Sequence, residues 1–255
     1  MVRPAIVVAT RNPKALYHAV SLLKTLNFEF EVLEPDNKLV LSASVVIVSF
    51  NDEISGLDPE RLVILGEHFD EELATIQIMM KLLRLHRPVG ATIGIDPGMR
   101  FGLALVVDGY VVNTRTLSTP HDATELTLRW ERYISELFPE VTTSFRIGTG
   151  YRLFTVLLLR SFPPDFHLTR VQLVDERNTT VVGETDQMAA VLIASRHGHN
   201  PTEADFRIDP KEGHVRTLLH MKRKLTEGKH KATKEQARMV LLGKMSLKEF
   251  LLIRD

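Results

Sequence analysis

The sequence predicts an α/β protein in which a small α/β domain precedes a mixed five-stranded sheet with flanking helices, and a basic helical tail follows. Three observations predict this arrangement. Short β-type runs alternate with segments of helical period along most of the chain. The pattern of elements changes at Pro88-Val89-Gly90, where a predicted helix ends and three consecutive predicted strands begin. From residue 214 to residue 255, Lys and Arg number 11 against 4 Asp and Glu.

The first domain, residues 1–88, is expected to hold four short strands and two helices. Strands are predicted over 5–9, 28–34, 45–50 and 61–65, because each run is bounded by Asn, Asp, Gly or Pro. Pro13 follows a polar turn and favours a helix that runs to about residue 26. A second helix is predicted over 70–85, and it should end before Pro88 because proline disfavours helical geometry in the preceding residue.

The second domain, residues 91–199, begins with three strands, at 92–96, 102–107 and 110–116. Asp108-Gly109 joins the last two, and Asp-Gly between β-type runs is a strong hairpin signal. A helix (123–138), a strand (144–147), a helix (151–160), a strand (168–174) and a helix (185–196) follow. Residues 200–213 are predicted to be a linker, and the tail from 215 mostly helical with a break near Gly228-Lys229.

Composition narrows the class of protein. Lys plus Arg and Asp plus Glu both number 32, so the net charge gives no argument for a polyanionic partner, whereas the basic tail does. A hydrophobic content of 44% supports well-packed cores. No apolar run is long enough to span a membrane and no secretory signal is evident, so we expect a cytoplasmic protein. The absence of cysteine excludes disulfides and thiolate metal sites.

Three acidic residues stand where an element meets the edge of the predicted sheet. Asp96 ends an apolar strand, where an aspartate is costly unless it reaches solvent, a donor or a cation. Glu176 follows the strand 168–174 and would emerge at the same edge if the two strands are parallel and close. Asp186 opens the last helix of the domain. The alternatives are a plain Asp-Pro-Gly turn, a local ion pair and stabilisation of the helix dipole, respectively.

Together these motifs resemble a known family. IGIDPGMRFGLAL is similar to the first-strand signature of RuvC-like resolvases and of the YqgF family, DERNTT resembles a YqgF segment, and TDQMAAVLI resembles its last helix. The resemblance covers roughly residues 91–198 and implies a ribonuclease H-like fold with Asp96, Glu176 and Asp186 as catalytic, metal-binding acids. Carboxylate oxygens suit Mg²⁺ or Mn²⁺, which can activate water for phosphodiester hydrolysis. One departure is the strand 145–148, which reads FRIG where RuvC has an acid.

Basic residues near these motifs and in the tail are the expected nucleic-acid contacts. They are Arg100, Arg177, Lys222, Arg223, Lys224, Lys229 and Lys231. Two alternatives stay open for the tail, which could pack on the body through apolar side chains at 218, 219, 225, 239, 242 and 250, or mediate self-association as a homodimer. His197 and His199 could bind metal, although a solvated helix end is the simpler interpretation.

Two classes of function follow from the sequence. The first is a metal-dependent endonuclease acting on structured RNA or branched DNA, and the second is a non-catalytic protein of the same fold that binds nucleic acid or a protein partner. An actin-like phosphotransferase shares the Asp-x-Gly opening, but this domain lacks the second phosphate loop of that class. At the N-terminus, IVVATRNPKA locally resembles the opening of a family of nucleoside triphosphate pyrophosphatases, and the likeness ends after these ten residues.

Overall fold

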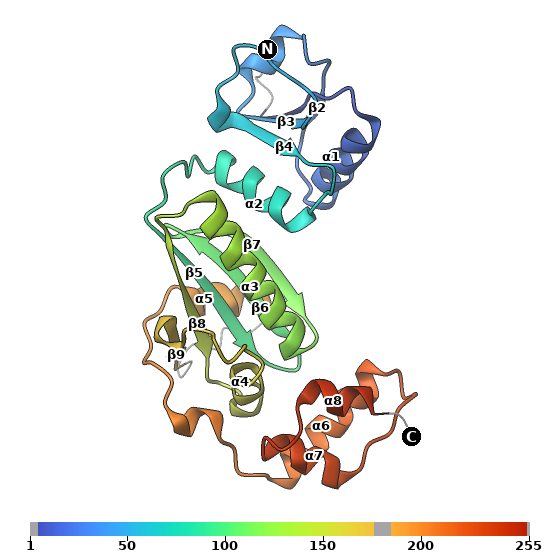
Figure 1. The fold of residues 1–255 in the computed structure, drawn as a ribbon, viewed down its shortest axis with the longest axis vertical. Helices are drawn as coiled ribbons and strands as arrows, with labels where there is room; N and C mark the ends of the chain where they lie inside the picture. The colour runs from blue at the N-terminus through green and yellow to red at the C-terminus, as the bar shows by residue number, and fades with distance from the viewer. Residues whose placement is uncertain (1–4, 176–184, 254–255) are drawn as a thin grey trace. The chain divides into compact units, whose positions relative to one another are not determined.

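The computed structural model describes residues 5–175 and 185–253 of the 255-residue chain. The chain divides into two compact units, unit 1 (Met1–Val89) and unit 2 (Gly90–Asp255), drawn in blue to blue-green and in green to red, respectively, in Figure 1. The division falls inside the Pro88-Val89-Gly90 segment, where the pattern of the sequence changes. Each unit contains its own sheet.

Unit 1 is built on a parallel sheet with the strand order β2-β1-β3-β4. The strands are β1 (Ile6–Val8), β2 (Glu31–Val32), β3 (Val45–Ser49) and β4 (Leu62–Leu65). The chain passes from β1 to β2 on one side and then returns to β3 on the other side of β1, so the order of winding switches between β1 and β3. The strand expected over 28–34 shortens to two exposed residues, because Phe28 and Phe30 pack against the core instead.

Both α-helices of unit 1 pack on one face of this sheet, and a 3-10 helix packs on the other. Helices α1 (Pro13–Thr25) and α2 (Glu71–Leu82) share one core with alternate strand residues such as Val8 and Ile47. The opposite face packs against residues of the short 3-10 helix η1 (Lys38–Ser42), and a second one, η2 (Pro59–Arg61), precedes β4. Asn12 begins α1, because its side chain accepts hydrogen bonds from two backbone N–H groups of the first turn.

Unit 2 contains a mixed sheet with the order β7-β6-β5-β8-β9. Its strands are β5 (Gly90–Pro97), β6 (Phe101–Val107), β7 (Tyr110–Leu117), β8 (Thr142–Gly148) and β9 (Val171–Val174). Strand β6 is antiparallel to both neighbours, whereas β5, β8 and β9 are parallel to one another. The predicted hairpin is present: Asp108 and Gly109 both have positive φ, at 47° and 85°, as a two-residue turn of this kind requires.

Helices cover both faces of the mixed sheet (Figure 1). On one face lie α3 (Pro120–Leu137) and α4 (Arg152–Leu159), and on the other lies α5 (Asp186–Ala194). The ring of Phe101 meets that of Phe154 on α4 edge-on at 5.9 Å, whereas the next residue of β6, Gly102, faces α5. The 3-10 helix η3 (Leu168–Arg170) takes the first three residues expected for the last strand, which begins at Val171.

The described part of the tail, residues 200–253, is folded. It consists of the 3-10 helix η4 (Glu203–Phe206) and the helices α6 (Glu212–Leu225), α7 (Lys234–Leu241) and α8 (Leu247–Leu252). Leu218, Val240 and Phe250 contribute a small apolar interior, and Gly228 has the positive φ of the predicted break. Within residues 5–175 and 185–253, no helix combines the length and the apolar character needed to cross a membrane.

Candidate functional site

Asp96 lies at the carboxyl end of β5, on the face of the sheet that α5 covers. Side chains alternate between the two faces of a strand, and Asp96 is two residues beyond Gly94, which faces the backbone of α5. Its partner in the ladder to β6 is Gly102. The Asp96 side chain is partly buried, so the carboxylate sits at the edge of the sheet where solvent and protein meet.

Two glycines bring α5 onto the sheet beside Asp96. A methyl group on Gly102 would stand 1.8 Å from the backbone oxygen of Asp186, and one on Gly94 would stand 2.1 Å from that of Ala190. Directly opposed antiparallel residues have Cβ positions about 5 Å apart, so the Asp186 backbone lies within roughly 7 Å of the Asp96 Cβ. The first and third acids of the predicted set are therefore neighbours in the fold.

An ion pair joins Asp186 to the loop between β5 and β6. Arg100 Nη2 is 2.9 Å from Asp186 Oδ2, and the two side chains are 62% and 28% exposed. Asp186 is also the first residue of α5, where Thr185 caps the helix by accepting a hydrogen bond from Met188 N–H. A carboxylate in the first turn is favoured by the helix dipole. Both interactions hold the Asp186 side chain at the start of α5, beside the loop between β5 and β6.

Strand β9 leads toward the same edge as β5, because β5, β8 and β9 are parallel. The strand ends at Val174, and Asp175 beyond it is exposed. Glu176 and Arg177, the second acid of the predicted set and a predicted phosphate contact, lie outside the described residues. In the described parts of the chain, no group of three or more His, Asp or Glu side chains could hold a metal ion. The described members of the predicted set are the two acids Asp96 and Asp186.

The position on β8 where the resemblance would place an acid is close to a basic residue, Arg146. It pairs with Gly94 in the ladder, and its guanidinium donates a hydrogen bond to Ala194 O at the end of α5. Burial lowers the pKa of Arg146. A positive charge at a helix C-terminus is favoured by the dipole. Arg146 therefore holds the far end of the helix whose first turn carries Asp186.

His197 and His199 lie in the segment that follows α5 and runs against β9. The backbone of His199 exchanges two hydrogen bonds with Leu173, at 3.1 and 2.7 Å. A methyl group on Gly198 would stand 2.1 Å from Leu173 O, so only glycine allows this approach. Both histidines are exposed. The segment thus forms one isolated antiparallel bridge with β9, and the exposure of both histidines agrees with the interpretation as a solvated helix end.

Lys222 is buried, which corrects its assignment as a phosphate contact. The residue is 1% exposed, and its Nζ donates hydrogen bonds to Phe250 O at 2.8 Å and to Ile253 O at 2.9 Å. The carbonyl groups at the end of a helix have no intrahelical donor, so Lys222 satisfies the end of α8 and fixes it to α6. The sequence predicts that all three residues of the run Lys222-Arg223-Lys224 contact nucleic acid, but the helical phase turns its first member inward.

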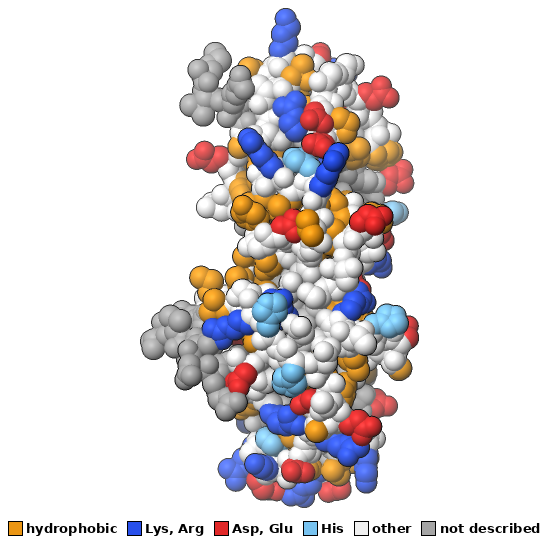
Figure 2. Space-filling model, turned by 90° about the vertical axis from the view of Figure 1, so that its left-hand side faces the viewer, with side chains coloured by type: hydrophobic (Ala, Val, Ile, Leu, Met, Phe, Trp, Pro, Cys, Tyr) orange, Lys and Arg blue, Asp and Glu red, His pale blue; other side chains and the backbone are white. Residues whose placement is uncertain are grey.

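The other tail cations of the predicted set are exposed. They are Arg223, Lys224, Lys229 and Lys231. Arg223 and Lys224 share one exposed face of α6 with Arg216, while Lys229 pairs with an adjacent glutamate at 2.7 Å. Figure 2 shows Lys and Arg side chains gathered at the end of unit 2 that the tail forms, with acidic side chains among them. The tail therefore presents exposed cations, some of which are paired with acidic side chains.

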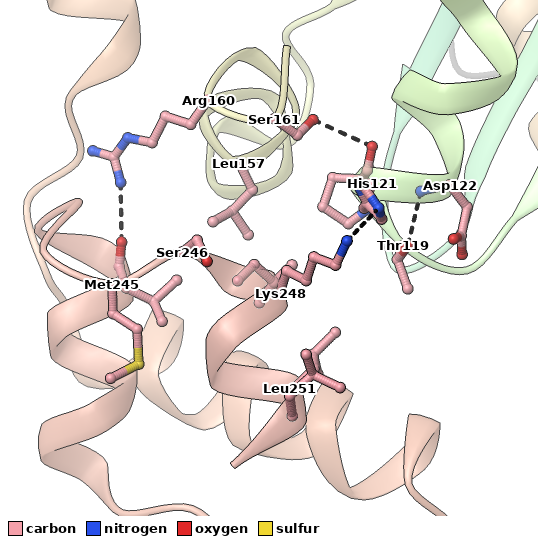
Figure 3. A pocket seen from close by; sticks show the side chains of 14 residues that line it. Thr119, His121, Asp122, Leu157, Arg160, Ser161, Met245, Ser246, Lys248 and Leu251 are labelled. Carbon is pink, nitrogen blue, oxygen red and sulfur yellow. Dashed lines mark hydrogen bonds between the residues drawn. The ribbon is translucent and has the colours of Figure 1, made fainter. Parts of the chain in front are cut away.

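A cavity of about 430 Å³ lies between the tail and the helices α3 and α4 (Figure 3). Apolar side chains such as Leu157 and Leu251 line much of it, and Lys248 Nζ is 3.3 Å from His121 Nε2 at its side. Arg160 joins α4 to the tail by donating hydrogen bonds to Val240 O and Leu241 O, each at 3.0 Å. Burial lowers the pKa of Arg160. None of the predicted site residues lines this cavity, so it belongs to the docking of the tail.

A second polar cluster, which sequence reasoning missed, lies in unit 1. The carboxylate of Asp52 accepts hydrogen bonds from the Thr10 hydroxyl, from Arg11 N–H at 3.2 Å and from Ser49 N–H at 3.0 Å. Burial by itself raises the pKa of Asp52, but the hydrogen bonds to the carboxylate together outweigh this effect. The pKa of Asp52 is therefore lowered. The sequence signal that could have pointed to this cluster is the polar turn that follows each of the strands β1 and β3, because ligands of parallel sheets bind at the carboxyl ends of the strands.

Comparison with known proteins adds no relative. No family model, no curated protein and no solved structure matches the chain. The fold and the site define the class as an α/β protein with one parallel sheet, one mixed five-stranded sheet and two acids together at an edge of the mixed sheet.

Proposed function

We propose that unit 2 is a divalent-metal-dependent nuclease of the ribonuclease H-like superfamily, related to the RuvC and YqgF group, that acts on structured RNA or branched DNA. The observation that carries the proposal is the contact of Gly102 with the first turn of α5, which puts Asp186 beside Asp96 on one face. The strand order, with only β6 antiparallel within the described sheet, supports the fold assignment.

The two acids fit a divalent cation. Asp96 is fixed by a strand and Asp186 by a capped helix, so two carboxylates from rigid elements reach one edge. Oxygen ligands of this kind suit Mg²⁺ or Mn²⁺, and Glu176 would complete the set that the resemblance implies. A cation held there supplies the charge that activates a water molecule and stabilises the leaving oxygen of a phosphodiester. In this proposal the protein positions the cation with two acids on rigid elements and supplies a nearby arginine.

Arg100 has a defined part in this proposal. In the described structure its guanidinium neutralises Asp186, and its 62% exposure leaves it free to turn toward solvent. When a cation takes over the charge of the carboxylate, the guanidinium can instead bind a phosphate oxygen of the substrate, to which arginine is well suited. The exposed tail cations Arg223, Lys224, Lys229 and Lys231 would contact phosphates at a distance from the acids.

The alternative is a non-catalytic protein of the same fold that binds nucleic acid. The observation that favours it is Arg146 on β8, on the same face as the acids, where the resemblance would supply a further carboxylate. A positive charge there weakens the attraction for a cation without affecting contacts of the tail with phosphate.

A cleavage panel separates the two. Four-way DNA junctions and RNA hairpins are incubated with the full chain and with Mg²⁺, Mn²⁺ or chelator. We expect cleavage only with a divalent ion, lost in Asp96→Asn and kept in the control Asp165→Asn, which alters an exposed acid of the same unit. Binding without cleavage by the wild-type chain in every metal would support the non-catalytic protein. Cleavage by Asp96→Asn at the wild-type rate would remove the proposed site.

A further inference from the structure

Unit 1 contains a cavity of about 340 Å³ outside the carboxyl ends of its parallel strands. Its walls come from three places: Asn12, Lys14 and His18 at the start of α1, Phe50 after β3, and residues 65–69 between β4 and α2. The order of winding switches between β1 and β3, and ligands of open parallel sheets bind outside the carboxyl ends of strands at such a point. The cavity is therefore where the topology of this sheet favours a ligand.

The frame of this cavity is held by hydrogen bonds. Asp52 ties the turn after β1 to the turn after β3 through Thr10, Arg11 and Ser49. Phe50 N–H donates to Leu65 O at 3.1 Å, which ties the turn after β3 to the end of β4. The three chain segments that form the walls are thus fixed before any ligand arrives, which reduces the entropy lost on binding.

The lining combines cations with aromatic faces. Lys14, His18 and His68 supply positive or protonatable groups, against one acid, Glu67. The rings of His18 and Phe69, which both line the cavity, stack at 4.5 Å with an angle of 9°. Phe50 also lines the cavity and is 47% exposed. A flat apolar surface next to a lysine matches a ligand that joins a ring to an anion.

The start of α1 is not itself the anion site. The Asn12 side chain already accepts hydrogen bonds from Lys14 N–H and Ala15 N–H, at 3.0 and 3.2 Å. The binding charge has to come from side chains, of which Lys14 is exposed and has no salt-bridge partner within 4.0 Å among the described residues. The volume of the cavity is at the small end of the roughly 300–1,000 Å³ found for ligand pockets, and it is enough for one ring and one phosphate group.

We propose that this cavity binds a small planar ring carrying a phosphate, a ligand of the nucleoside monophosphate class. The ring lies against Phe50 and the stacked pair His18 and Phe69, and the phosphate is bound by Lys14. This site is separate from the proposed nuclease site, since every residue that lines it belongs to unit 1.

Calorimetric titration of the full chain tests the proposal. The probes are the four nucleoside monophosphates, adenosine as the ring alone and inorganic phosphate as the anion alone. We expect at least one monophosphate to bind at least tenfold more tightly than adenosine or phosphate. Lys14→Ala should weaken the monophosphate at least tenfold and leave adenosine unchanged, whereas Phe50→Ala should weaken both.

Two further variants make the outcome decisive. Lys24→Ala removes an exposed lysine at the other end of α1 and should change nothing. Glu67→Gln removes the one acid of the lining and should strengthen monophosphate binding about two- to fivefold, which a misfolded variant cannot do. No binding of any monophosphate at millimolar concentration would overturn the proposal. So would equal losses in Lys14→Ala and Lys24→Ala.

Discussion

The guanidinium of Arg100 lies 2.9 Å from the carboxylate of Asp186 and thereby ties the loop between β5 and β6 to the first turn of α5. In the proposed site the same carboxylate is a metal ligand, so Arg100 and the cation compete for one negative charge. Arg100 is 62% exposed, and an exposed ion pair contributes at most about 1 kcal/mol. A divalent cation can therefore displace the arginine at a modest cost.

Arg100→Ala is expected to strengthen Mn²⁺ binding up to about fivefold, because removing the competitor returns at most about 1 kcal/mol. Calorimetric titration with Mn²⁺ measures this effect without reference to activity. Arg132→Ala is the matched control, because Arg132 is also an exposed arginine paired with an acid, Glu136 on α3. Weaker Mn²⁺ binding in Arg100→Ala would show that the arginine supports the site instead of competing for it.

Gly102→Ala is expected to destabilise unit 2 by about 1–3 kcal/mol, because its methyl group would stand 1.8 Å from Asp186 O and push α5 from the sheet. Urea denaturation followed by the fluorescence of the buried Trp130 measures the change. Gly90→Ala is the control in the neighbouring strand, since a methyl group there meets no atom within 4 Å. Equal stability of the two variants would mean that α5 does not press on β6 as described.

Tail cations are expected to contribute to nucleic-acid binding through charge alone. Replacing both Arg223 and Lys224 by Ala should reduce the slope of log affinity against log salt by about 0.7–0.9 for each lost phosphate contact. Lys222→Met should leave the slope unchanged and instead lower the stability of the tail, because its Nζ bonds two interior carbonyl groups. An unchanged slope in the double variant would leave these two cations solvated and outside the recognition surface.

Asp52 is expected to make the stability of unit 1 depend on pH. Hydrogen bonds from Thr10, Arg11 and Ser49 lower its pKa below the ordinary 3.8, so its contribution is present above that pH and is lost as the pH falls through the folded value. Asp52→Asn should therefore melt at a lower temperature than wild type at pH 7, and the difference should shrink below pH 3.8. Scanning calorimetry measures both, with Glu53→Gln as the adjacent control. A difference that is independent of pH would contradict the role of the charge.

The strands and helices were largely predictable because their signals are local. The period of apolar residues, the hairpin turn at Asp108-Gly109 and the start of α1 at Pro13 depend on neighbours in the sequence, and each appears in the structure. The exceptions have tertiary causes. The strand at 28–34 is reduced to two residues because its aromatic side chains pack against the core. Lys222 points inward because the helical phase and the carbonyl groups at the end of α8 both favour that position.

The candidate site was predictable in part. Asp96 and Asp186 could be singled out by motif, but which element approaches Gly102 could not, since the contact joins residues 84 positions apart in the sequence. The same limit explains why Asp52 was missed, because its partner Thr10 is 42 residues away. Contacts of this kind follow from strand order, which a single sequence does not specify.

The most direct test of the account is whether Asp96 and Asp186 form one divalent-cation site. Mn²⁺ binding to the full chain is measured by electron paramagnetic resonance for wild type, for Asp96→Asn, for Asp186→Asn and for the double variant, with Asp165→Asn as control. If the acids share a cation, each single substitution removes most of the binding and the double variant loses little more, because coupled residues are not additive. If both single variants bind Mn²⁺ as wild type does, the two acids do not form a metal site and the proposed nuclease loses its basis.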